Sequence, residues 1–149
     1  MTVSRIDHVG ITTSDVDRSL AFYRDLLGMR IIDDLVVTSP EIASLLGVDS
    51  VELRIVDLDS GDGRIVELIK YMQPEGKPAT YDSRDAGTGH IAFTVDDLDR
   101  VRRRIAAAGG RVISHQPITI TDPRGLFDGA TCLYLRDPDG MILELVQRP

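Results

Sequence analysis

One pattern occurs twice in this chain, as HVGITTSDVDR over residues 8–18 and as HIAFTVDDLDR over residues 90–100. Polar and apolar positions match almost throughout, and the same offset of 82 residues sets Gly28 against Gly110. Each copy predicts a strand led by a histidine, an acidic turn, a helix that ends at a glycine, and a further strand. The sequence therefore predicts one structural module that is present twice.

The first copy predicts a βαβββ order. Asp15 or Ser14 can cap a helix that ends at Gly28, because short polar side chains accept hydrogen bonds at helix starts and glycine stops helices. The rest of this copy predicts strands over residues 30–37, 51–58 and 64–71. A turn over residues 59–63 joins the last two strands, and residues 40–47 predict a short helix.

The second copy predicts a helix over residues 97–108, a strand over residues 111–116 and a hairpin of residues 130–136 with 141–147. We expect a first module at residues 1–75, a linker at residues 76–88 and a second module at residues 89–149. Each module offers a sheet with one apolar face, so pairing the two modules buries both faces. The predicted fold is α+β, with two pseudo-symmetric βαβββ modules that form an open, curved mixed sheet.

Composition narrows the classes of partner. The chain has 149 residues, 42% of them hydrophobic, and 24 acidic against 17 basic residues give a net charge of −7, which disfavours nucleic acid. No apolar run approaches the length of about 20 residues that a membrane span needs. The single cysteine, Cys132, forms no intrachain disulfide, and no secretion signal opens the chain, so we expect a cytoplasmic location.

Each copy also places one glutamate inside an apolar strand, Glu67 in RIVELI and Glu144 in MILELV. An ionised carboxylate in such a place must be paired, hydrogen-bonded or coordinated. The first strands carry His8 and His90 in the same way. If the modules meet about a pseudo-twofold axis, the two pairs converge, and this predicts a metal site with two histidines and two glutamates.

The predicted ligand set limits the metal. Imidazole and carboxylate ligands without a thiolate suit Zn, Ni, Co, Mn or Fe(II), and four ligands leave one or two positions for water or substrate. Open positions favour catalysis. A structural role for each of these residues is the alternative, but it would have to apply twice. His115 has no partner in the first copy and is interpreted as a structural or outer-shell residue.

The chain resembles the vicinal-oxygen-chelate superfamily over nearly its whole length. The matching motifs are Ile6-Asp7-His8-Val9, Leu27-Gly28-Met29, Gly89-His90-Ile91-Ala92-Phe93 and Leu135-Arg136-Asp137-Pro138-Asp139-Gly140 before Glu144. The resemblance implies that both modules form one domain around a metal. It also implies a small-molecule substrate whose adjacent oxygens approach the ion, and a homodimer.

Within this superfamily, the set His8, Glu67, His90 and Glu144 resembles glyoxalase I. That resemblance implies a divalent-metal-dependent lyase or isomerase for a small carbonyl or thioester substrate. The metal would stabilise an enediolate while Glu144 moves a proton, with Glu67 as the alternate base. No glutathione-contacting pattern occurs between Tyr71 and Thr88, so a glutathione or other thiol cosubstrate is left open. Candidate substrate contacts are Arg124, Tyr71, Tyr81 and Gln116.

Other functions stay open at this point. One alternative is an isomerase like methylmalonyl-CoA epimerase, and another is an Fe(II)-dependent dioxygenase that uses three of the four ligands and not Glu67. A third is a small-molecule-binding resistance protein of the bleomycin type, and a fourth is the same fold with vestigial site residues and no metal. The sequence does not decide the substrate, the metal, or whether modules pair within one chain or between chains.

Overall fold

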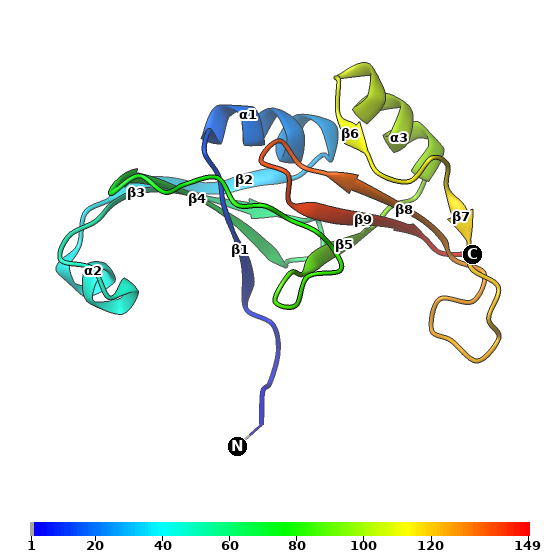
Figure 1. Ribbon diagram of the computed structural model, residues 1–149, viewed down its shortest axis with the longest axis horizontal. Coiled ribbons are helices and arrows are strands. Elements are labelled where there is room, and N and C mark those ends of the chain that lie inside the picture. The colour runs from blue at the N-terminus through cyan, green and yellow to red at the C-terminus, as the bar shows by residue number, and fades with distance from the viewer. Residues whose placement is uncertain (1) are drawn as a thin grey trace. The chain divides into compact units, whose positions relative to one another are not determined.

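Two open mixed sheets, one in each half of the chain, form the framework of the protein (Figure 1). The computed structural model describes residues 2–149. The chain divides into two units after Pro78, and the second unit is Ala79–Pro149. The α+β class and the repeated βαβββ order are confirmed. The module limits of residues 75 and 89 stay a prediction.

The first unit contains a four-stranded sheet in the order β1-β4-β3-β2. Only β1 and β4 run parallel, and the other neighbours are antiparallel. The predicted turn over residues 59–63 joins β3 to β4, as expected. The elements in chain order are β1 (His8–Thr12), α1 (Val16–Leu20), the π-helix η1 (Ala21–Leu26), β2 (Arg30–Val37), α2 (Pro40–Leu46), β3 (Glu52–Asp59) and β4 (Ile65–Gln73).

The second unit repeats this arrangement with the strand order β5-β9-β8-β6, and a short strand, β7, also pairs with β8. Again the first and last strands, β5 and β9, are parallel neighbours. The elements are β5 (His90–Thr94), α3 (Leu98–Ala107), β6 (Arg111–Val112), β7 (Ile118–Thr119), β8 (Thr131–Arg136) and β9 (Ile142–Gln147).

The two units share one strand register. In β1 and β4, Gly10 stands opposite Glu67, and in β5 and β9, Ala92 stands opposite Glu144. His8 and His90, two residues earlier on the first strands, therefore lie on the same sheet faces as these glutamates, because side chains alternate along a strand. The sequence repeat is thus also a repeat of backbone pairing.

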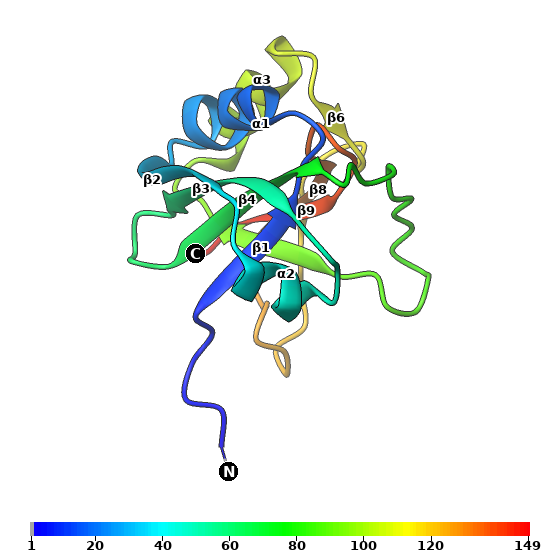
Figure 2. The ribbon, with the colours of Figure 1, turned by 90° about the vertical axis from the view of Figure 1, so that its left-hand side faces the viewer.

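Each face of the first sheet has a different environment. Helix α1 lies on one side of β2, β3 and β4 in both views, whereas α2 lies on the other side (Figures 1 and 2). The α1 side is fully packed, with Val56, Leu58 and Leu68 at 0% exposure. Arg54, which shares that face, also pairs with Asp17 of α1 at 3.3 Å. Glu67 is on the opposite, more open face.

The first helix holds one residue more than its counterpart. Asp15 and Asp97 cap the two helices and are 82 residues apart, but the glycines with positive φ that end them, Gly28 and Gly109, are 81 apart. The π-helix η1 absorbs the extra residue, since its wider turn uses bonds such as Leu27 N–H to the Phe22 carbonyl. Matching Gly28 to Gly110 was therefore wrong by one position.

The predicted strand over residues 111–116 is also wrong beyond Val112, where β6 ends. The N–H groups of Ile113 and Ser114 both donate to the Tyr134 carbonyl, and the Ser114 hydroxyl accepts from the Tyr134 N–H. The Ser114 hydroxyl therefore accepts the Tyr134 N–H, which in a regular antiparallel sheet would donate to a backbone carbonyl. The chain then pairs again at β7, a strand that the sequence did not predict.

Gly110 is required for space, which gives a prediction on stability. A Cβ there would overlap the Ile105 side chain and lie 2.9 Å from the Ile105 carbonyl oxygen. We expect Gly110→Ala to lower the free energy of unfolding by about 1–3 kcal/mol, the usual effect of overpacking. Gly76→Ala is the control, because a Cβ there meets nothing within 4 Å. Urea unfolding of both variants measures the difference, and equal stabilities would refute this packing argument.

Candidate functional site

The first unit brings His8 and Glu67 together on the open face of its sheet. His8 begins β1, and its Nε2 atom lies 3.9 Å from Oε1 of Glu67 in β4. The side chains of His8 and Glu67 are 48% and 22% exposed, respectively. The pair is therefore reachable from solvent.

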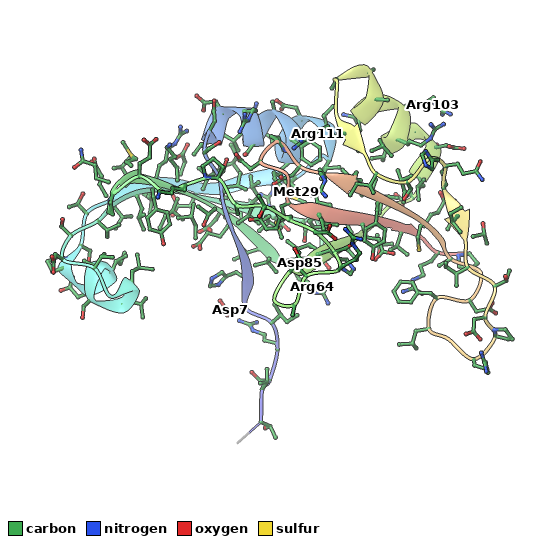
Figure 3. All side chains as sticks on the ribbon, in the orientation of Figure 1. Asp7, Met29, Arg64, Asp85, Arg103 and Arg111 are labelled. Carbon is green, nitrogen blue, oxygen red and sulfur yellow. The ribbon has the colours of Figure 1, made fainter. Side chains whose placement is uncertain are left out.

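Asp7 holds the other nitrogen of the His8 ring. Its Oδ1 atom lies 3.2 Å from Nδ1 of His8, at the start of β1 (Figure 3). This hydrogen bond raises the pKa of His8, with a further contribution from the charge of Glu67, and it lowers the pKa of Asp7. A carboxylate on one imidazole nitrogen fixes the ring and leaves the other nitrogen free to bind a metal, which is the usual arrangement of ligating histidines.

The second unit forms the equivalent pair with a shorter separation. Nε2 of His90 lies 3.2 Å from Oε2 of Glu144, whose side chain is only 9% exposed. The Tyr134 hydroxyl also lies 3.2 Å from Nε2 of His90. Burial, followed by the charge of Glu144, raises the pKa of Tyr134. Burial and a hydrogen bond with Glu144 raise the pKa of Cys132 to about 11, so this thiol is protonated at neutral pH.

We call the pair His8 and Glu67 and the pair His90 and Glu144 the two candidate half-sites. They differ in the residues next to the His and the Glu. Opposite Glu67 across the hairpin stands Asp57, and opposite Glu144 stands Tyr134. Gly89 takes the place before His90 that Asp7 takes before His8. Asp7 thus gives the first half-site a carboxylate on the histidine, and Tyr134 gives the second a hydroxyl.

The distance within each His and Glu pair can be compared with the spacing of two ligands on one ion. Two ligand atoms bound at about 2.1 Å from one ion lie roughly 3.0–3.4 Å apart in octahedral or tetrahedral geometry. The His90 and Glu144 atoms, 3.2 Å apart, already have this spacing, whereas those of His8 and Glu67, 3.9 Å apart, would have to approach by roughly 0.5–0.9 Å. Among residues 2–149, no group of three or more His, Cys, Asp or Glu side chains is arranged to hold a metal. Within each unit, the candidate donors are therefore one His and one Glu.

The remaining candidate residues differ in their surroundings. His115 and Gln116 are exposed, and Arg124 pairs with Asp122 at 3.0 Å. Tyr81 is half-buried, and Tyr71 packs beside α2 on the Glu67 face. Sequence reasoning missed the roles of Asp7, Asp57 and Tyr134. Only Asp7 had a usable signal, its position directly before a candidate ligand.

The structure also bears on the question of a membrane span. The longest α-helix is α3, with 10 residues, and nowhere in residues 2–149 is a helix both long and apolar enough to cross a bilayer.

Comparison with known proteins gives a consistent relationship. A model of the Glyoxalase/Bleomycin resistance protein/Dioxygenase superfamily matches residues 5–145. A 2-epi-5-epi-valiolone epimerase from Actinomyces sp. is 30% identical over 147 residues, with 97% of this chain and 79% of the relative covered. A probable lactoylglutathione lyase from Vibrio cholerae is 30% identical over 149 residues, with 99% and 93% covered. A glyoxalase family protein from Bacillus cereus has the same fold, with a TM-score of 0.84 at 19% identity and coverage of 99% and 95%.

Proposed function

The chain belongs to the Glyoxalase/Bleomycin resistance protein/Dioxygenase superfamily, and we propose that it is a divalent-metal-dependent lyase or isomerase of the glyoxalase type. Its substrate is a small carbonyl or thioester compound. One observation carries the proposal, namely that the same His and Glu pair recurs at the same strand register in both units. A structural role for these residues would have to apply twice, at matching positions of both units.

In this proposal, His8, Glu67, His90 and Glu144 together bind one ion of Zn, Ni, Co, Mn or Fe(II). The donor set supports this choice, because it joins imidazole nitrogen with carboxylate oxygen and contains no thiolate. The two modules and their linker act as one domain, and the protein is a homodimer. Four protein ligands leave room for one or two substrate oxygens in a five- or six-coordinate site.

The reaction moves a proton between carbon and a glutamate. When bound, the metal polarises a substrate carbonyl and makes the neighbouring C–H more acidic, which is worth several kcal/mol. The Glu144 carboxylate would accept that proton while the C–H electron pair forms the new carbon–carbon double bond and the carbonyl π pair moves onto the carbonyl oxygen. Glu144 would then return the proton to the adjacent carbon. The hydroxyl of the first carbon becomes the new carbonyl and its proton passes to the oxygen anion, so the substrate is isomerised without net gain or loss of atoms.

The shielding of Glu144 supports its role as the base. Its side chain is 9% exposed, against 22% for Glu67, so the captured proton exchanges less readily with bulk water. Tyr134 and Cys132 pair with residues on the same face of β9 and help to exclude solvent. Glu67 is then chiefly a ligand and the alternate base.

A second candidate, an epimerase, is favoured by the 30% identity to 2-epi-5-epi-valiolone epimerase. An epimerase returns the proton to the opposite face of the same carbon. That step needs a second acid, and Glu67 is the residue of this chain that the repeat makes equivalent to Glu144. The two candidates therefore share the site and differ in the duty of Glu67.

Proton transfer in heavy water tests the proposal. The protein is reconstituted with each divalent ion and incubated in D₂O with 2-oxoaldehyde hemithioacetals and with epimerisable acyl thioesters, each prepared with a small uncharged thiol as well as with glutathione or coenzyme A. A lyase or isomerase converts the first class, whereas an epimerase incorporates deuterium into the second. Failure of every metal form to convert or exchange either class would count against the proposed reaction.

Asp7 should strengthen metal binding through His8. We expect Asp7→Asn to weaken metal affinity by about 10- to 100-fold, because outer-shell carboxylates orient the ligand and raise its basicity. Asp49→Asn, a change at an exposed loop carboxylate, should leave the affinity unchanged. Isothermal titration of both variants with the preferred ion gives the comparison. Equal affinities would show that Asp7 does not support the site.

A further inference from the structure

Around Glu67, the open face of the first sheet carries a line of negative charge. Glu67 stands opposite Asp57 of β3, which in turn stands opposite Asp33 of β2. Residues directly opposite share a face, and neighbouring strands lie about 4.8 Å apart, so these three carboxylates form an acidic row. The charge of Asp57 also contributes to the raised pKa of His8, as expected for a group on this face.

Next to the acidic row, the same face becomes apolar. Two residues further along the strands, Ile69 stands opposite Ile55, and Ile55 stands opposite Leu35. Ile55, Ile69 and Tyr71 are half-buried and pack against the core cluster of Ala43, Val51 and Leu53, while Leu35 keeps 51% of its surface exposed. We call Leu35, Ile55, Ile69 and Tyr71 the apolar patch. Helix α2 contributes Ile42 and Ala43 to this cluster.

Gly10 leaves free space at the border between the acidic row and the apolar patch. A Cβ at this position would lie 3.4 Å from Cδ1 of Ile69 and 3.6 Å from Oε1 of Glu67. Gly10 does not have a positive φ, so its backbone conformation does not require glycine. The equivalent residue in the second unit is Ala92. A glycine inside a strand costs stability, so the missing side chain points to a use for the space.

We infer that the substrate carries an uncharged, apolar group beyond its metal-binding oxygens, and that this group lies over Gly10 against Ile69 and Ile55. The inference rests on the proposed function and names its substrate class. Apolar contact favours such a group, and the two members of the acidic row that do not bind the ion, Asp57 and Asp33, repel an anionic one within the screening length of about 8 Å. It follows that a glutathione or coenzyme A adduct, with carboxylates or phosphates on this side, is a poor substrate.

Hydroxamates test this selectivity without knowledge of the natural substrate, because they bind metals through two adjacent oxygens. The metal-loaded, full-length protein is titrated with acetohydroxamate, hexanohydroxamate and the monohydroxamate of succinate, which ends in a carboxylate. We expect hexanohydroxamate to bind at least about tenfold more tightly than acetohydroxamate, since each buried methylene adds to affinity. The succinate derivative should bind more weakly than acetohydroxamate, and Asp57→Asn should recover part of that loss.

Gly10→Ala is the decisive variant. Its added methyl group occupies the space beside Glu67 and Ile69, so the ratio of hexanohydroxamate to acetohydroxamate affinity should fall toward one. Alanine suits a strand at least as well as glycine, so this variant should melt no lower than the wild type. Gly76→Ala, where the new Cβ meets nothing within 4 Å, should keep the wild-type ratio.

The outcomes separate this inference from the proposed function. If acetohydroxamate binds but the hexanoyl form gains nothing, or the carboxylate form binds best, only the inference on substrate class is overturned. A wild-type ratio in Gly10→Ala overturns it as well. If Ile69→Ser changes the sedimentation mass but not the ratio, the apolar patch is an interface between copies and the inference is wrong. If no metal and no acetohydroxamate bind, the proposed function fails and takes this inference with it.

Discussion

Glu144→Gln is expected to lower kcat of the metal-loaded protein by about 10²- to 10⁴-fold, the usual contribution of a positioned general base. Glutamine keeps the size of the side chain and an oxygen that can bind a metal, but it cannot accept the substrate proton. Rates should be compared at equal metal content. A Glu144→Gln protein with near wild-type kcat would rule out Glu144 as the base.

The matched change Glu67→Gln distinguishes whether Glu67 acts only as a metal ligand or also as a second base. In a lyase with Glu144 as the only base, Glu67→Gln affects metal affinity more than kcat. In a two-base epimerase, both variants lose kcat to a similar extent. A dioxygenase that uses three ligands would keep its oxygen chemistry without Glu67.

Removal of the metal should lower the thermal unfolding midpoint by roughly 5–15 °C. An ion at about 100 to 1,000 times its Kd stabilises the folded state by about 2.7 to 4.1 kcal/mol, and each kcal/mol is worth about 2–4 °C in a chain of this size. Calorimetry with and without added chelator measures the difference. The effect should disappear in His90→Ala, whose side chain supplies a donor 3.2 Å from Glu144.

His115→Ala is the control for that experiment. His115 is exposed and has no counterpart in the first copy of the repeat, so the variant should keep the full shift on metal addition. If His115→Ala lost the shift while His90→Ala kept it, the ion would be bound elsewhere on the chain. A shift of equal size in both variants would also contradict the proposed site.

The two units surround the same His and Glu pair with different residues. In the first, Asp7 orients His8 and Gly10 leaves space beside Glu67. In the second, Ala92 occupies the place of Gly10, and Glu144 is largely buried. We interpret the first half-site as the side that receives the substrate and the second as the side that moves the proton. In this interpretation, the repeat supplies the proposed ligands, and the differences between its copies supply the asymmetry that the proposed reaction needs.

Much of this fold could be predicted because its signals are local. The turn over residues 59–63 and the cap at Asp15 are set by residues adjacent in sequence, and both were confirmed. The His and Glu pairs could be predicted because the same residues occur at matching positions in both copies of the repeat. Their closeness within each unit then follows from parallel pairing of the first and last strands.

The remaining features depend on contacts that the sequence does not display. The π-helix η1 accommodates one residue more than the second helix has. This difference is seen only once the structure gives the first and last residues of both helices. The early end of β6 results from Ser114 bonding to Tyr134, which is 20 residues away. Asp57 and Tyr134 become neighbours of the glutamates only through the hairpin register.

The central claim is that His8, Glu67, His90 and Glu144 bind one ion together, and metal content tests it most directly. Elemental analysis is made on the purified wild type, on the single alanine variants of these four residues, and on His115→Ala. We predict one equivalent of metal per chain in the wild type and in His115→Ala, and a large loss in each of the four variants. A wild type that takes up no divalent ion would contradict the claim, as would loss in the variants of one unit only.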